Sequence, residues 1–267
     1  MKPNKNQNHT LPTSHPRYES LKFRHKIIEG MKNIVVAEAG LIAHGRGECF
    51  DYILGERTTQ TAKKAITAAV AALLLAKKPV ISVNGNVAAL IPHELVILSK
   101  TINAPLEINL FYQKEGRIEA IKNILQKAGA EKIYGIDPNK MVEIEGLESN
   151  RRKVELIAQA DLVMIPLEDG DRTEALKRLN KKIVAVDLNP LSRTSLWADI
   201  TIVDNIVRVI PEMIITAKEL KKLNNLELES IVKNFDNKKN IQKTLNYIIE
   251  YIEKQKERLF DLANFRS

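Results

Sequence analysis

The chain has 267 residues, 44% of them hydrophobic, with 41 Lys and Arg against 33 Asp and Glu and therefore a net charge of +8. This length and composition suit one large α/β domain or two small ones. The longest uninterrupted apolar run, residues 68–76, is well short of the roughly 20 residues that cross a bilayer. We expect no membrane partner. Because the amino terminus lacks an apolar secretory segment and Cys49 is the single cysteine, we expect a cytoplasmic protein.

The positive net charge raises the question of a nucleic-acid partner, because a basic surface attracts phosphate backbones. Basic residues near the carboxyl terminus, such as Lys218 and Lys238, alternate with acidic residues such as Glu219 and Asp236. A mixed pattern of this kind is typical of a solvated helix face. We therefore expect no nucleic-acid partner.

The predicted elements begin after a polar, proline-containing stretch at residues 1–16, which we interpret as a flexible arm. A helix pattern follows at residues 19–31. From Thr58 to Lys78 the chain is rich in alanine and has no Gly or Pro, which predicts a long buried helix. Five short β-branched runs then alternate, for the most part, with helix-patterned segments, and this alternation predicts a parallel sheet with helices on both faces. These runs are Pro79–Val83, Leu106–Leu110, Lys132–Ile136, Asp161–Ile165 and Lys182–Val186.

Beyond Asn205 the pattern is helical to the end of the chain, including a Lys/Glu-rich stretch from Lys238 to Phe260. This helical tail could pack on the domain or on a second subunit. We divide the chain into the arm (residues 1–16), a main α/β domain (residues 17–222) and a helical extension (residues 223–267).

The stretch Ile183–Arg208 contains two apolar runs, each of which ends in polar residues. In an open parallel sheet, ligands bind just beyond the carboxyl ends of the strands. Carboxylate, amide, hydroxyl and guanidinium groups together suit a nucleotide better than an apolar ligand. The alternative is a loop in which Asp187 caps a strand end and Arg193 forms a surface ion pair. The candidates, which we call the polar rim, are Asp187, Asn189, Ser192, Arg193, Thr194, Asp204 and Asn205.

The stretch Gly40–Thr58 contains four glycines around several charged residues, and we interpret it as a glycine-rich loop. Small residues let the backbone approach a ligand, and Arg46 can offer a planar fork to phosphate. It is not a dinucleotide fingerprint, because no third glycine follows at the GxGxxG spacing. The alternative is a tight surface turn in which His44 has only a structural role.

The stretch Ser82–Leu90 leads from a predicted strand into a helix, and its backbone N–H groups with the Asn84 and Asn86 amides would make an anion cradle. The alternative is an Asn-Gly turn with Asn86 as the helix cap. Asn109 would lie at the tip of the next strand, where a structural role is the alternative.

Glu168, Asp169 and Asp171 follow another predicted strand, and three carboxylates repel one another unless a cation or a nearby arginine shares the site. Magnesium bound with ATP would resolve this repulsion, because Mg²⁺ takes one or two carboxylates plus phosphate oxygens. In the alternative, Asp171 and Glu174 cap a helix while Glu168 and Asp169 face water. The sequence has no P-loop, GxSxG or HExxH motif, which argues against the common phosphate-loop and hydrolase classes.

Several motifs in this order resemble the archaeal phosphopantothenate synthetases, the 4-phosphopantoate–β-alanine ligases of coenzyme A biosynthesis. The resemblance extends from about Ser14 to Arg208, and the helical tail is less distinctive. The motifs are SHPRY (14–18), GLIAHGRGE (40–48), VNGNVAAL (83–90), EINLFY (107–112), PLEDGDRTEAL (166–176), DLNPLSR (187–193) and DITIVDNIVR (199–208).

The resemblance implies a Rossmann-like homodimer that uses ATP to join 4-phosphopantoate and β-alanine through an acyl-adenylate, releasing AMP and pyrophosphate. Arg46, Arg193 and Mg²⁺ would offset the charge of the reacting anions, and His44 or Asp169 would accept a proton from the amine. A noncatalytic nucleotide-binding or nucleic-acid-binding regulator is the alternative. The resemblance implies ATP contacts at Arg24, Arg46, Asp187, Leu188, Asn189, Arg193, Thr194, Asn205 and Ile206, and we place the substrate at Asn84, Gly85, Asn86 and Asn109.

Overall fold

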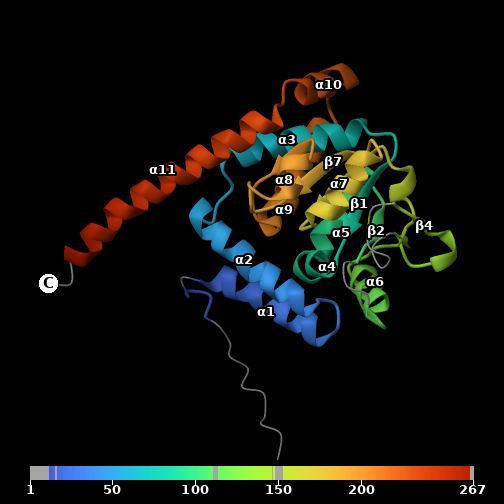
Figure 1. Cartoon of the computed structure of the whole chain (residues 1–267), viewed down its shortest axis with the longest axis horizontal. Helices are drawn as coiled ribbons and strands as arrows, with labels where there is room; N and C mark the ends of the chain where they lie inside the picture. Colours follow the sequence, from blue (N-terminus) through green and yellow to red (C-terminus); the bar gives the residue numbers. More distant parts are fainter. Residues whose placement is uncertain (1–11, 16, 111–113, 146, 148–152, 265–267) are drawn as a thin grey trace, which may run out of the picture.

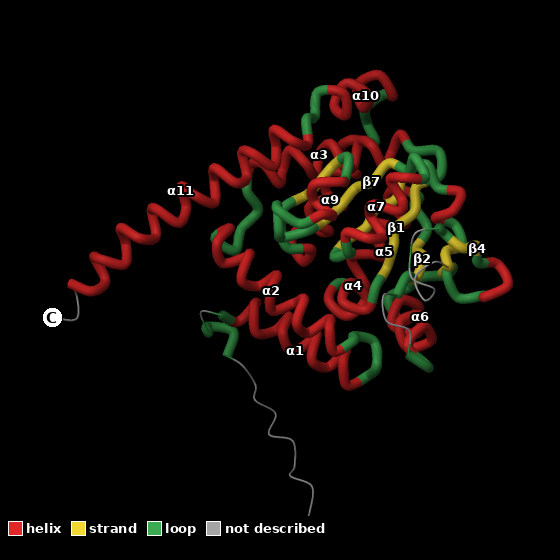
Figure 2. The backbone as a smooth tube through the Cα atoms, viewed as in Figure 1, coloured by secondary structure: helices red, strands yellow, loops and turns green. Residues whose placement is uncertain are grey.

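A six-stranded, all-parallel sheet lies at the centre of the computed structural model, which describes residues 12–15, 17–110, 114–145, 147 and 153–264 (Figure 2). The strand order is β3-β2-β1-β6-β7-β8, so the chain turns back between β1 and β6 and continues toward the opposite edge. This reversal is the topological switch point of a Rossmann-like sheet. The strands are β1 (Pro79–Val83), β2 (Leu106–Ile108), β3 (Ile133–Tyr134), β6 (Leu162–Pro166), β7 (Lys182–Val186) and β8 (Ile200–Ile202).

Helices cover both faces of the sheet, as the alternating pattern predicts. Alternate residues of one strand enter different apolar clusters: Val184 and Val186 lie in one, and Ile183 and Ala185 lie in the other. This alternation follows from the period of two in a β-strand. One face packs against α3 (Gln60–Leu75), α5 (Pro92–Ile102), α6 (Arg117–Lys127) and α9 (Ile206–Leu220), and the other against α7 (Gly170–Arg178) and the end of α8 (Arg193–Trp197).

The stretch interpreted as a glycine-rich loop is instead α2 (Glu38–Leu54), and the loop prediction is wrong. Of the four glycines in this stretch, only Gly55, directly after the helix, has a positive φ, of 79°, where it ends the helix in the left-handed conformation. Within the helix, Gly40 permits a close approach, because a Cβ there would lie 2.4 Å from Oδ1 of Asn86. The small residues therefore bring protein segments together, and this packing offsets the low helix propensity of glycine.

Two of the alternative interpretations also need correction, because the side chains that cap the helices differ from those named there. The cap of α7 is Asp169, whose Oδ1 accepts a hydrogen bond from the backbone N–H of Arg172 at 3.0 Å, and Asp171 lies within the first turn. The cap of α4 (Gly85–Leu90) is Asn84 and not Asn86. In both places the capping side chain belongs to the residue directly before the first helical residue, where it reaches the free N–H groups of the first turn. The sequence patterns also missed two elements of two residues each, the antiparallel strands β4 (Val142–Glu143) and β5 (Lys153–Val154).

Two N-terminal helices, α1 (Tyr18–Lys32) and α2, lie side by side at one end of the molecule, and α10 (Asn225–Lys233) lies at the opposite end (Figure 1). The helical tail continues through α11 (Asn237–Asn264). Its first half packs on the main domain: Thr244 Oγ1 donates to Thr61 Oγ1 at 2.9 Å, and Tyr247 donates to the Leu54 carbonyl at 3.2 Å. Its second half extends away from the body (Figure 1). None of the described helices is long and apolar enough to cross a membrane.

Helical glycines that meet different surroundings provide a stability test of this packing. A Cβ at Gly85 would lie 2.1 Å from the Val35 carbonyl oxygen, whereas a Cβ at Gly45 would meet nothing within 4 Å. We expect Gly85→Ala to lower the free energy of unfolding by about 2 kcal/mol or more. Gly45→Ala, the matched control, should raise it by up to about 1 kcal/mol because alanine favours the helix. Chemical denaturation measures both, and equal stability of the two variants would contradict this account of α4.

Candidate functional site

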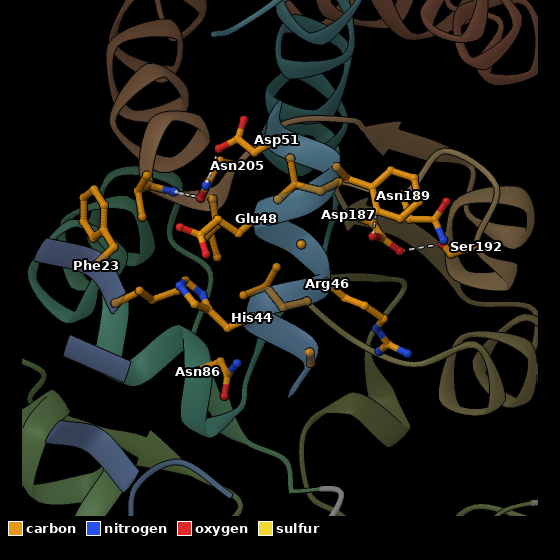
Figure 3. A pocket seen from close by; sticks show the side chains of 18 of the residues that line it. Phe23, His44, Arg46, Glu48, Asp51, Asn86, Asp187, Asn189, Ser192 and Asn205 are labelled. Carbon is orange, nitrogen blue, oxygen red and sulfur yellow. Dashed lines mark hydrogen bonds between the residues drawn. The ribbon is translucent and has the colours of Figure 1, made fainter. Parts of the chain in front are cut away.

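A cavity of about 700 Å³ lies beyond the carboxyl ends of β6, β7 and β8, next to the switch point of the sheet (Figure 3). Its walls come from α1, α2, α4, the turns that follow β6 and β7, and the start of α9. This is the position at which open α/β sheets bind ligands. Of the predicted site residues, the cavity is lined by His44, Arg46, Asn86, Asp169, Asp187, Leu188, Asn189, Arg193, Thr194, Asn205 and Ile206.

The segment after β7 is held in place by its own polar side chains. Asp187 accepts hydrogen bonds from the backbone N–H of Asn189, at 2.9 Å, and from the Ser192 hydroxyl, at 2.5 Å. The same hydroxyl accepts from the Ser195 N–H at 2.9 Å and so caps α8. Burial raises the pKa of Asp187, and the two hydrogen bonds and the charge of Arg46 oppose that rise. The polar rim after β7 is thus prearranged without a ligand.

Helix α2 places its side chains on two sides of the cavity. His44 and Glu48 are one turn apart and lie on the side of Phe23, whereas Arg46 extends on the side of Asp187 (Figure 3). This follows from helical geometry, in which residues i and i+4 share a face and residue i+2 does not. Burial lowers the pKa of His44, so its imidazole is neutral at pH 7 and can accept a proton.

Arg24 does not line the cavity, but it contacts Glu48, which does. Its Nη2 donates to both carboxylate oxygens of Glu48, at 2.8 and 2.7 Å, and Ser20 Oγ donates to the same carboxylate at 2.6 Å. Burial acts to raise the pKa of Glu48, but the hydrogen bonds from Ser20 and Arg24 outweigh it, and the pKa lies below its usual range. These contacts join α1 to α2 beside the cavity.

A second set of charges joins α2 to the start of α9. Arg208 donates to the Asp51 carboxylate at 2.5 and 3.1 Å, and to Asp204 at 2.5 and 2.9 Å. Asn205 caps α9 and also donates to Asp51, at 2.8 Å. Arg208 and Asp51 were not among the site residues predicted from the sequence. The spacing of Asp204 and Arg208 suits a helix pair, but nothing in the sequence connects either of them with Asp51.

The carboxylates of the turn between β6 and α7 each have a different partner. Glu168 lies 3.3 Å from Nε of Arg172, with side chains 7% and 2% exposed, and burial raises the pKa of Glu168 to about 7 while Arg172 opposes the rise. Asp169 caps α7, and Asp171 pairs with Arg193 on the surface. The alternative in which Glu168 faces water is therefore wrong. In the part of the chain that the structure describes, no group of three or more acidic, His or Cys side chains is arranged to hold a metal ion.

Three residues predicted to bind the substrate lie outside the cavity lining. Asn84 caps α4 and also donates to the carbonyls of Pro166 and Leu167, at 3.1 and 3.0 Å. Gly85 packs against the backbone of the α1–α2 connection. Asn109 is buried and donates to the Glu107 carbonyl at 3.3 Å. Among the residues of the predicted cradle, Asn86 alone reaches the cavity, and it also donates to the Gly40 carbonyl at 2.9 Å.

The fold and the cavity define a class of protein, the Rossmann-like α/β proteins with a polar site at the switch point, an arrangement that typically binds nucleotides. Comparison with known proteins gives the family. A family model described as phosphopantothenate/pantothenate synthetase matches residues 61–251. This chain belongs to that family, which confirms the resemblance of its motifs.

Similar proteins cover nearly the whole chain. It is 54% identical over 256 residues to the 4-phosphopantoate–beta-alanine ligase of Thermococcus onnurineus, with 95% of each chain aligned. It is 56% identical over 241 residues to the protein of that name from Thermococcus kodakarensis, covering 89% of this chain and 92% of the relative. It is 46% identical over 245 residues to the protein of that name from Methanosarcina mazei, covering 91% of this chain and 96% of the relative.

The raised pKa of Glu168 predicts a pH dependence of stability. Its carboxyl holds a proton in the folded state up to about pH 7, whereas the value for an unperturbed glutamate is 4.5. The folded state binds the extra proton between these values, so stability falls as pH rises from 4.5 through 7. Relative to Glu168→Gln, the wild-type protein should lose about 3 kcal/mol of unfolding free energy between pH 4.5 and pH 8. Chemical denaturation of both proteins at each pH measures this difference, and a pH-independent difference would contradict it.

Proposed function

We propose that this chain is a 4-phosphopantoate–β-alanine ligase of coenzyme A biosynthesis. The observation that carries the proposal is the match to ligases of that name along nearly the whole chain. The polar cavity at the switch point supports it, because the reaction needs one site that holds a nucleotide and two small polar substrates. We also propose a cytoplasmic location, supported by the single cysteine.

The proposed chemistry begins with activation of a carboxylate, because a carboxylate does not react with an amine at neutral pH. The phosphopantoate carboxylate attacks the α-phosphorus of ATP, pyrophosphate leaves, and an acyl-adenylate forms. The β-alanine amine then attacks the acyl carbon, and AMP leaves as the amide forms. The first step brings anions together, and in this proposal Arg46 and Arg193 offset the repulsion from two sides of the polar rim.

We propose that ATP occupies the part of the cavity between α2 and the segments after β7 and β8. Arg46 extends toward Asp187 there, and the prearranged backbone after β7 adds polar groups for ribose or base (Figure 3). Arg24 would contribute through the Glu48 contact. The proposed ATP contacts are Arg24, Arg46, Asp187, Leu188, Asn189, Arg193, Thr194, Asn205 and Ile206.

We propose that Mg²⁺ enters together with ATP, held chiefly by phosphate oxygens. Mg²⁺ commonly keeps several waters and takes only one or two carboxylates besides substrate phosphates. The carboxylates of the β6–α7 turn are already engaged, because Glu168 is buried beside Arg172 and Asp169 caps α7, so the phosphate oxygens hold the ion. Bound in this way, the ion would neutralise part of the triphosphate charge.

The amine of β-alanine must lose a proton in the second step, and we propose His44 or Asp169 as the acceptor. The neutral imidazole of His44 supports the first assignment. Asp169 lines the cavity, although one of its oxygens already accepts from the α7 backbone. For the substrate we propose contact with Asn86, while Asn84, Gly85 and Asn109 support the walls around it from outside the lining.

We further propose that the protein is a homodimer in which the helical extension takes part. The second half of α11 extends from the body and exposes Ile249 and Ile252, which are 62% and 46% accessible (Figure 1). A second copy of the chain would cover such apolar side chains. In this proposal residues 17–222 form the ligase domain and residues 223–267 form the extension. Light scattering on the purified protein tests the oligomeric state.

The proposed reaction predicts which nucleotide product forms and when. With ATP, Mg²⁺, 4-phosphopantoate and β-alanine together, we expect AMP and pyrophosphate in equal amounts, because the α-phosphorus is attacked. Omitting any one substrate in turn should abolish steady AMP release. Formation of ADP, or AMP release that does not depend on β-alanine, would contradict the proposed mechanism.

Two substitutions test the assignment of the polar rim. Arg193→Ala and Asn189→Ala should each weaken ATP binding about tenfold or more, because each removes a polar partner of the nucleotide. Thermal unfolding should show that both variants keep the fold, since Arg193 is exposed. Arg178→Ala is the matched control, because Arg178 also pairs with Glu174 and is 68% exposed but lies outside the cavity lining. Unchanged ATP affinity in both rim variants would refute the assignment.

A further inference from the structure

Three buried side chains contain polar atoms that have no hydrogen-bond partner within the described part of the chain. They are Ser82, through Oγ, Asn109, through Oδ1, and Arg172, through Nε and Nη1. Buried polar atoms are nearly always paired, so an exception requires an explanation such as a bound ligand or water. The proposed ATP contacts include none of these three residues.

The three side chains lie on the same face of the sheet, near its switch point. Ser82 follows Val80 by two residues in β1, and Val80 packs in the cluster of the α7 face. Asn109 follows Glu107 by two residues, and Glu107 lies opposite Ser82 in the β1–β2 register. Arg172 lies one turn before Leu176 on α7, and Leu176 packs in the same cluster. The sheet therefore brings the unpartnered atoms toward the carboxyl ends of β1, β2 and β6.

Glu168 connects this region with the cavity. This residue lines the cavity, and its side chain lies 3.3 Å from Nε of Arg172, a contact that does not satisfy the Nε–H as a hydrogen bond. A buried guanidinium whose donors lack partners is unfavourable, and the carboxylate of a ligand can accept a hydrogen bond from such a donor. The arrangement thus offers an anion site at Arg172 and a cation site at Glu168.

We propose that Glu168 and Arg172 form the binding subsite for the β-alanine zwitterion, an inference that rests on the proposed ligase function. Arg172 binds the carboxylate of the amino acid, and Glu168 binds its ammonium group at the cavity wall. The present contact between the two side chains is exchanged for one contact each with the ligand.

The charges of this region favour a zwitterion over the other substrates. A phosphate group carries about two negative charges and would lie beside the Glu168 carboxylate, which repels it. A zwitterion meets one group of each sign, so neither buried charge is left alone. The pKa of about 7 at Glu168 agrees with this role. Burial disfavours the ionised carboxylate, and a bound ammonium group would stabilise it.

The test separates the two half-reactions. Exchange of labelled pyrophosphate into ATP, driven by 4-phosphopantoate alone, reports adenylate formation without β-alanine. In Arg172→Gln we expect this exchange to stay within about twofold of wild type while KM for β-alanine rises at least about tenfold, because a charged hydrogen-bond partner is lost. Arg178→Gln on the same helix should leave the exchange and KM for β-alanine unchanged, since Arg178 is 68% exposed and pairs with Glu174.

Propylamine, which has the chain of β-alanine without the carboxylate, distinguishes recognition from a merely structural role. Wild-type enzyme should prefer β-alanine strongly in kcat/KM, and Arg172→Gln should lose most of that preference. A structural defect would lower kcat/KM equally for β-alanine and for propylamine. An unchanged preference, with exchange intact, would overturn the subsite.

Glu168→Gln provides a second route if Arg172→Gln does not fold. This variant should raise KM for both amines and leave pyrophosphate exchange intact, because both amines carry the ammonium group. Unchanged KM values for both amines would overturn the subsite while the ligase function stands. Absence of both exchange and ligation in the wild-type protein would refute the proposed function itself, and the subsite with it.

Discussion

The contact of Arg208 with Asp51 and Asp204 is the interaction on which the geometry of the cavity depends. It joins α2, which carries His44 and Arg46, to the chain directly after β8. Asp51 and Asp204 are 8% and 1% exposed, and two buried carboxylates would repel each other without the shared guanidinium. Burial acts to lower the pKa of Arg208, but the hydrogen bonds that Arg208 donates to Asp51 and Asp204 and the two negative charges outweigh it and raise the pKa. The cation therefore stays charged, and α2 keeps its position over the strand ends.

This constraint explains how a helix of unfavourable composition holds functional groups. Three glycines lie within α2, each of which costs roughly 1 kcal/mol of helix propensity relative to alanine. Contacts with the surrounding structure offset these losses. Asn86 donates a hydrogen bond to the Gly40 carbonyl, Glu48 pairs with Arg24 of α1, and Leu54 packs in one apolar cluster with Leu188. Such a helix forms because the surrounding structure fixes it, and its side chains are accordingly placed by tertiary contacts.

The difference between structure set by local sequence and structure set by tertiary contacts decides what could be predicted from the sequence. Burial on both faces gives parallel strands continuous β-branched runs, so β1 and β7 were predicted at their observed bounds. The polar rim followed, because strand ends in a parallel sheet converge by geometry alone. Helix α2 was missed because its glycines read as a loop and its partners lie far away in sequence. Arg172 was missed because its burial depends on how α7 docks against the sheet, and the local sequence resembles an exposed helix start.

The two sides of the switch point have different electrostatic character, and this difference bears on how three substrates share one site. On the side of α2 and β7, the guanidinium groups of Arg46 and Arg193 are exposed and can contact phosphates. On the side of α7, Glu168 and Arg172 are already desolvated and nearly neutral as a pair. A polyanion entering there would meet a pair with little net charge, whereas at the rim it meets cations. The fold thus supports a division in which the nucleotide and the amino acid approach the reacting carboxylate from opposite sides of the β6–α7 turn.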